Sequence, residues 1–215
     1  SVINACAKGD KWQRPLALLD EMRRCALVPA AITYNSVINA CAKGGEYQRA
    51  LNLLEVMQRC GLVPNEITYS SVIDACANGG KWQCALDLLG EMRRCGLVPN
   101  EITYSSVINA CAKGGVWQCA LNLLDEMRRH GMAPDEIAYS SVINACAVGG
   151  ECQRALELFD QMRLCNLTPN LVTYAAALHA CAINRQPERA LSLFESLQQD
   201  GLTPDLGHWS QLLDA

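Results

Sequence analysis

A repeat of 35 residues constrains the fold of this chain more than any other feature. Proline recurs at that step at Pro29, Pro64, Pro99, Pro134, Pro169 and Pro204. The same step relates Tyr34, Tyr69, Tyr104, Tyr139 and Tyr174, and it relates Cys6, Cys41, Cys76, Cys111, Cys146 and Cys181. We therefore divide the chain into full units at 31–65, 66–100, 101–135, 136–170 and 171–205, with a partial unit at 1–30 and the start of another at 206–215.

Each unit reads as two helices. In 66–100, Asn65 is a good N-cap, the first helix is expected over about Ile67 to Ala77, and the Gly79-Gly80 pair should end it. The second helix should start near Lys81, because an apolar stripe follows at helical spacing. Two columns are expected to take the left-handed conformation that ends a helix. The first is Gly9, Gly44, Gly79, Gly114, Gly149 and Asn184, and the second is Ala26, Gly61, Gly96, Gly131, Asn166 and Gly201, of which all but Ala26 suit that conformation.

A single hairpin of this size cannot bury its own apolar faces, whereas stacked hairpins can. The sequence therefore predicts an all-α fold, a right-handed α-solenoid (superhelix) of helix–turn–helix repeats with a concave inner face. Small residues recur in register where helices should approach closely, at Ala50, Ala85, Ala120, Ala155 and Ala190.

Composition narrows the function. A net charge of −4 argues against a bulk polycation, and no apolar run is long enough to span a bilayer. The 13 cysteines fall into repeat columns without C-x-x-C or Cys/His ligand spacing, so we expect small buried hydrophobes in a reducing compartment and no metal site. The histidines are scattered and the Gly-Gly pairs are helix stops, so no enzyme and no cofactor is predicted.

The pattern resembles the pentatricopeptide repeat family. The unit reads Ile32-Thr33-Tyr34-Asn35-Ser36-Val37-Ile38, and then Cys41, Gly44, Ala50, Leu54, Met57, Gly61, Pro64 and Asn65. The uniform length is similar to that of the plain P-type class. This resemblance covers essentially the whole chain.

The resemblance implies binding of single-stranded RNA, one base per repeat. The base-specifying pairs would combine a post-tyrosine column with a last-residue column: Asn35 with Asn65, Ser70 with Asn100, Ser105 with Asp135, Ser140 with Asn170, and Ala175 with Asp205. An aliphatic column would sandwich the bases: Ile32, Ile67, Ile102, Ile137 and Val172. A lysine column would contact phosphate at Lys8, Lys43 and Lys113, and it is interrupted by Asn78, Val148 and Ile183.

The chemistry of the last-residue column can be argued independently of the family. Ionised Asp only accepts hydrogen bonds, while Asn donates and accepts. Guanine N1–H and uracil N3–H are donors, so Asp should favour G or U and Asn should favour A or C. In the family pattern, Ser in the post-tyrosine column goes with purines and Asn with pyrimidines. Together these two columns predict the bound RNA sequence, which from 5′ to 3′ is a pyrimidine with C favoured, then A, G, A and a weakly specified base.

Simpler roles compete at these sites. The last-residue column can serve as N-caps alone, the aliphatic column as plain core, and the lysines as charges that complement helix dipoles. Arg23-Arg24, Arg93-Arg94 and Arg128-Arg129 are interpreted as dipole and solvent residues of outer helices. Aromatic residues open several second helices, where packing between hairpins is favoured over stacking on bases: Trp12, Tyr47, Trp82 and Trp117.

Two function classes remain open. The first is a sequence-specific RNA-binding protein of organellar RNA processing, stability or translation, located by resemblance in a mitochondrion or chloroplast. The alternative is a protein–protein scaffold or a structural subunit of a large ribonucleoprotein, which the acidic charge and the gaps in the lysine column favour. Because both ends cut through a repeat, we expect the chain to belong to a longer array.

Overall fold

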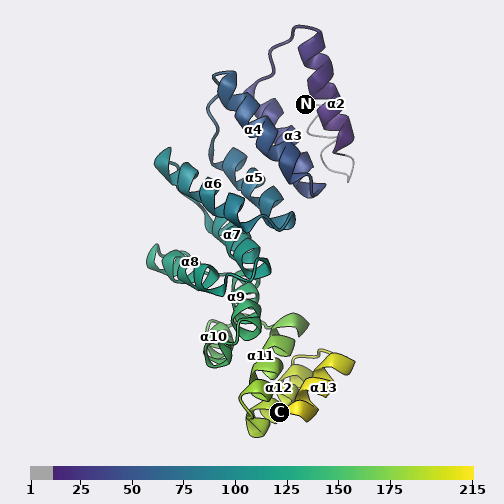
Figure 1. Ribbon diagram of the computed structural model, residues 1–215, viewed down its shortest axis with the longest axis vertical. Helices are drawn as coiled ribbons and strands as arrows, with labels where there is room; N and C mark the ends of the chain where they lie inside the picture. Colours follow the sequence, from purple (N-terminus) through teal and green to yellow (C-terminus); the bar gives the residue numbers. More distant parts are fainter. Residues whose placement is uncertain (1–11) are drawn as a thin grey trace. The chain divides into compact units, whose positions relative to one another are not determined.

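The computed structural model describes residues 12–215, and within them every regular element is an α-helix. The chain forms two compact units, one up to Ala110 and one from Cys111. Figure 1 shows the helices in chain order. They are α2 (Gln13–Arg24), α3 (Ala31–Lys43), α4 (Tyr47–Arg59), α5 (Glu66–Asn78), α6 (Trp82–Arg94), α7 (Glu101–Lys113), α8 (Trp117–Arg129), α9 (Glu136–Val148), α10 (Cys152–Leu164), α11 (Leu171–Ile183), α12 (Pro187–Gln199) and α13 (Leu206–Asp214).

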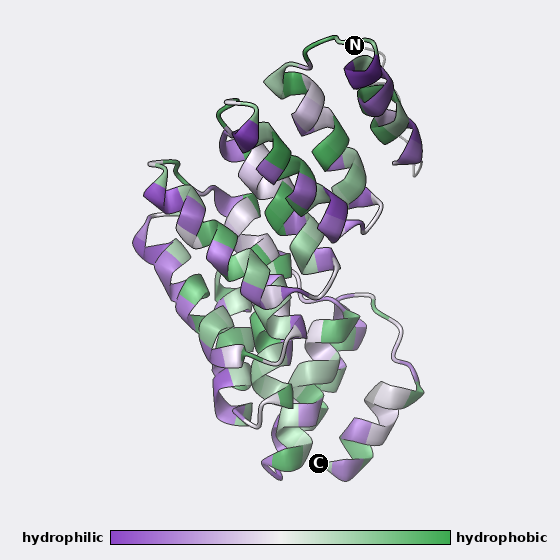
Figure 2. Ribbon diagram, turned by 45° about the horizontal axis from the view of Figure 1, so that its top comes forward, coloured by the Kyte–Doolittle hydropathy of each residue, from purple (hydrophilic) through white to green (hydrophobic). Residues whose placement is uncertain are grey.

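The helices pair and stack within each unit. In the first unit α3 packs on α4, α5 packs on α6, and the first helices α3 and α5 lie side by side. In the second unit α9 packs on α10, α11 packs on α12, and α9 lies beside α11. Hydrophobic and hydrophilic residues alternate along the helices, as Figure 2 shows. Stacked helical hairpins and an all-α fold are thus confirmed for the residues described.

The core is built from the columns that the sequence repeats. The five tyrosines of the repeat column, which are Tyr34, Tyr69, Tyr104, Tyr139 and Tyr174, are at most 1% exposed. The cysteines that lie late in first helices are fully buried, and so is every alanine of the column that begins at Ala50. The small alanine side chain lets the second helix of a hairpin lie close against its neighbours, as predicted.

The turns inside the hairpins differ from the prediction in one respect. The first glycine of each pair is not left-handed, since φ is −82° at Gly44 and −80° at Gly79. The second glycine takes the positive φ, 71° at Gly45 and 67° at Gly80. The column that ends the second helices is left-handed as predicted, with Asn166 at φ 58°, and Ala26, which was expected to be the exception, takes the same conformation at φ 55°.

The first glycine is needed for a different reason. A Cβ built on Gly79 would lie 2.7 Å from the ring of Tyr47 and 3.3 Å from the carbonyl oxygen of Ala75. A Cβ on Gly149 would likewise meet the ring of Trp117. The aromatic residue that opens one second helix therefore packs on the glycine turn of the next repeat, which supports the packing role over base stacking.

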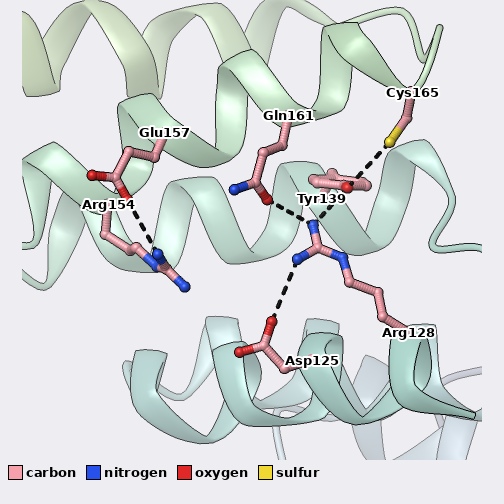
Figure 3. Close-up of polar contacts among 7 residues, drawn as sticks. All are labelled: Asp125, Arg128, Tyr139, Arg154, Glu157, Gln161 and Cys165. Carbon is pink, nitrogen blue, oxygen red and sulfur yellow. Dashed lines mark hydrogen bonds and ion pairs between the residues drawn. The ribbon is translucent and has the colours of Figure 1, made fainter.

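At four junctions between hairpins in residues 12–215, an arginine bonds to a tyrosine of the next hairpin. The guanidinium of Arg128 on α8 donates to the hydroxyl of Tyr139 on α9 at 2.6 Å and to Gln161 Oε1 at 2.9 Å, and it contacts the Asp125 carboxylate at 3.4 Å (Figure 3). The Tyr139 hydroxyl also lies 3.6 Å from the Cys165 sulfur. Arg23 and Arg93 are exposed and, like Arg128, lie in the last turn of their helices, as predicted, but the bonds to tyrosine were not foreseen. Equivalent arginine–tyrosine bonds join Arg23 to Tyr34, Arg93 to Tyr104 and Arg163 to Tyr174.

Candidate nucleic-acid interface

Apolar side chains project into solvent along the first helices. Each member of the aliphatic column is the second residue of its helix and is 58–72% exposed: Ile32, Ile67, Ile102, Ile137 and Val172. A core role for this column is therefore excluded. Large aliphatic side chains left this exposed at regular intervals provide contact area for a partner.

The last-residue column caps the first helices. The Oδ1 atom of Asn65 accepts the Thr68 backbone N–H at 3.0 Å, and the Asn100 and Asn170 oxygens accept those of Thr103 and Thr173 at 2.9 and 3.0 Å. Asp135 caps α9 in the same way through the Ala138 N–H at 2.8 Å. Capping fixes these side chains at the start of α5, α7, α9 and α11, next to the exposed aliphatic residue.

The two polar columns meet at a threonine of the following repeat. Asn35 Nδ2 lies 3.4 Å from Asn65 Oδ1, and the Thr68 hydroxyl donates to the Asn35 oxygen at 2.7 Å. In the next repeat the hydroxyl of Ser70 lies 2.6 Å from that of Thr103, which is also bonded to Asn100. Ser140, Thr173 and Asn170 repeat this arrangement in the second unit.

These threonines were missed in the sequence analysis. They lie in one column of the 35-residue repeat, three residues after each asparagine cap, which is the signal that could have identified them.

The capping bond decides what each last residue offers to a ligand. A backbone N–H can bond only to the carboxamide oxygen, so the Nδ2 group of Asn100 is the part directed away from the helix. Since Asn100 is exposed, that group can donate to a base acceptor such as adenine N1 or cytosine N3. A carboxylate at the same place presents a second acceptor oxygen instead.

Three members of the two polar columns differ from the rest. Ser105 and Ser140 are only 6% and 7% exposed, so their hydroxyls lie deeper than the last-residue side chains. Ala175 has no polar side-chain atom, and its predicted partner Asp205 is exposed.

The lysine column is only partly basic. Lys43 and Lys113 are exposed at the ends of their helices, whereas Lys8 lies outside the described residues. The replacements Val148 and Ile183 are 71% and 54% exposed, so the second unit presents apolar surface where a lysine would give positive charge.

The cysteines separate into a buried and an exposed set. Burial raises the pKa of the Cys76 and Cys111 thiols to about 12, and that of Cys41, Cys146 and Cys181 to about 11, so these thiols stay protonated at neutral pH. The expectation of uniformly buried cysteines is wrong for the column that ends the second helices. Its members Cys25, Cys60, Cys95 and Cys165 are exposed.

Neither a metal centre nor a membrane span is found in the part of the chain described. From residue 12 onward, the His, Cys, Asp and Glu side chains form no group of three or more arranged to hold a metal ion. Among the helices α2 to α13, none has the length and apolarity that a bilayer crossing requires.

Comparison with protein-family models gives matches along the chain. The model described as "PPR repeat family" matches residues 29–78 and 73–113, and "Pentatricopeptide repeat domain" matches 1–44, 122–182 and 165–215. A third model, "PPR repeat", matches 102–132. No significant match to a curated protein was found.

Solved structures with the same fold include RNA complexes. The maize pentatricopeptide repeat protein PPR10 is 29% identical with a TM-score of 0.70, over 99% of this chain and 30% of the maize chain. PPR10 in complex with an 18-nt psaJ RNA element is 26% identical with a TM-score of 0.68, over 99% and 35% of the two chains. The PPR domain of Arabidopsis thaliana protein-only RNase P 1, in complex with tRNA, shares the fold at 17% identity and a TM-score of 0.75, over 93% and 97%. The chain thus spans about a third of the PPR10 chains that it matches.

Proposed function

Because the chain belongs to the pentatricopeptide repeat family, we propose that it binds single-stranded RNA and reads one base with each full repeat. The PPR10 structure that contains an 18-nt RNA element supports this proposal, since 99% of this chain aligns with it. The proposal extends to an organellar role in RNA processing, stability or translation. The chain itself would act by occupying RNA, without a cofactor.

The observation that carries the proposal is the exposed aliphatic column beside the capping side chains. Each aliphatic residue of this column lies two positions after the last residue of the previous repeat, as Ile67 does after Asn65. A base that lies against the aliphatic side chain would find the polar pair at its Watson–Crick edge. Apolar contact supplies affinity that tolerates any sequence, and the polar pair supplies the choice of base.

The pairs predict the bound sequence. Asn35 with Asn65 would read a pyrimidine with C favoured, Ser70 with Asn100 would read A, Ser105 with Asp135 would read G, and Ser140 with Asn170 would read A. The pair Ala175 and Asp205 would discriminate weakly, because one member lacks a polar group.

Binding to short RNAs tests this function. We expect a C-A-G-A core to bind more tightly than a U-G-A-G core, with each wrong base costing about 1–3 kcal/mol. The logarithm of the binding constant should fall with the logarithm of salt concentration at a slope near −2, since about three basic contacts contribute roughly −0.7 each on single strands. Equal affinity for the two cores contradicts the assignment of bases.

A second candidate function is favoured by the lysine column. In the second unit Val148 and Ile183 replace lysine and are exposed, which suits contact with protein better than contact with phosphate. The chain would then act as a scaffold or a structural subunit of a ribonucleoprotein. The absence of RNA binding at low salt would support this function over the first.

A further inference from the structure

We propose that Thr68, Thr103 and Thr173 are positioning residues, which fix the hydrogen-bonding groups that the base-specifying pair of the preceding repeat presents to RNA. The inference rests on the proposed function and adds a third residue, from the next repeat, to each pair. All three threonines are fully buried, so they act through the pair and do not touch RNA themselves.

The geometry at Thr103 shows how this works. Its backbone N–H and its hydroxyl both donate to the Oδ1 atom of Asn100, each at 2.9 Å. A carboxamide oxygen has two lone pairs, so both are occupied by the same threonine. The Asn100 side chain is held at two points, and its Nδ2 group is directed away from them.

The same hydroxyl also orders Ser70. A threonine hydroxyl has a single hydrogen, and at Thr103 it is given to Asn100. The Ser70 hydroxyl must therefore donate across the 2.6 Å that separates the two oxygens, and it offers its lone pairs to a ligand. One buried hydroxyl thus sets the donor and acceptor pattern of both members of the pair.

The arrangement recurs elsewhere in the chain. Thr173 donates to Asn170 at 3.0 Å from its N–H and at 2.9 Å from its hydroxyl, and it lies 2.6 Å from Ser140. Thr68 holds two asparagines with two donors, since its backbone N–H donates to the Asn65 oxygen at 3.0 Å and its hydroxyl donates to the Asn35 oxygen at 2.7 Å.

One repeat provides an informative exception. Ala138 stands where the others have threonine, and the cap before it is Asp135. An ionised carboxylate has two acceptor oxygens, so it presents an acceptor whichever way it turns. Asparagine must be oriented to present a donor. In these four capped helices, threonine accompanies asparagine and alanine accompanies aspartate, which is what an orienting role requires.

The test replaces Thr103 by valine, which keeps the branched shape and removes the hydroxyl. We expect the preference for A over G at the second base of the C-A-G-A core to fall by about 2- to 12-fold, the equivalent of one neutral hydrogen bond. The preference for G over A at the third base, read by Ser105 and Asp135, should stay the same. Thr103→Ser, which restores the hydroxyl, should restore the preference.

Two further variants make the result decisive. Thr33→Val is the matched control, because Thr33 holds the same place in α3 but its cap is Ala30, which has no side-chain oxygen. It should leave the preference unchanged at every base. Thr173→Val should lower the preference at the fourth base and serves as the second variant if Thr103→Val does not fold. Thermal melting monitors folding in each case.

The outcomes separate the two levels of the argument. If the unaltered protein prefers A at the second base and Thr103→Val and Thr173→Val keep their preferences, the positioning role is overturned and the proposed function stands. If the unaltered protein binds no RNA or shows no base preference, the proposed function is overturned and the positioning role with it.

Discussion

Replacement of Asn100 by aspartate should change the base that one repeat reads while leaving the fold intact. The substitution replaces the Nδ2 donor by a second acceptor oxygen of almost the same shape. The cap should persist, because Asp135 already accepts the Ala138 N–H at 2.8 Å in the equivalent place. A carboxylate at a helix N-terminus also gains about 0.3–1 kcal/mol from the helix dipole, so stability should be equal or slightly higher.

The size of the change follows from the polar contact that is reversed. Adenine N1 accepts a hydrogen bond and guanine N1–H donates one, so the unaltered protein should favour A by about 1–3 kcal/mol and the variant should favour G by a similar amount. The ratio of the two affinities should therefore shift by about 2–6 kcal/mol, which is about 30- to 10⁴-fold.

Fluorescence anisotropy with labelled RNAs that differ only at the second base of the core measures this ratio. All titrations should use the same salt concentration, since the variant carries one more negative charge. Asp135→Asn is the matched control, because it makes the reverse exchange and should move the third base from G towards A. An unchanged A-to-G ratio in a variant that still binds and melts normally would refute the account of base choice.

Four further results are expected. Ile102→Ala should weaken RNA binding about fivefold for every base sequence, because it removes apolar contact area. The free energy of unfolding should change by less than about 0.5 kcal/mol, since the side chain is 70% exposed. Fluorescence anisotropy measures the first effect and urea denaturation the second. Gly149→Ala should lower the free energy of unfolding by about 1–3 kcal/mol, because the added methyl meets the Trp117 ring, and Trp117→Leu in the same chain should restore part of it. The Cys76 thiol has a pKa of about 12 when folded and about 9 when unfolded, so its contribution to stability is complete below pH 9 and is lost as pH rises towards 12. Urea denaturation at pH 8 and pH 10 should detect this loss. Exposed Cys95 should react with a thiol reagent at pH 8 in the folded protein, while Cys76 should not.

Local signals in the sequence predicted the helices well. The first helix of the second full unit was expected over about Ile67 to Ala77 and is found over Glu66–Asn78, with Asn65 as its cap. The second was expected from near Lys81 and starts at Trp82. Capping and helix-ending residues act within a few positions of the chain, so a single unit contains the information.

Contacts between repeats were harder to predict. Arg128 and Tyr139 lie on successive hairpins, and their bond depends on how the hairpins rotate against each other, which helical periodicity does not specify. The same holds for Gly79. The sequence suggested a left-handed helix end there, whereas the residue must be glycine because the Tyr47 ring of the preceding hairpin packs against it. The aliphatic column could not be assigned for this reason either, because two repeats must be stacked before Ile67 is seen to face solvent.

One junction in the first unit differs from the others in its cross-repeat link. Gln58 stands where the repeats on either side have Arg23 and Arg93, and the Tyr69 hydroxyl donates instead to Glu91 of its own hairpin at 2.8 Å. The two second helices are joined there by a bond from Gln58 to Glu91 at 3.0 Å, which has no cationic partner. In a stacked array each boundary contributes its own coupling energy, so under tension or at rising temperature α4 and α6 should separate before the junctions that Arg23 and Arg93 bridge.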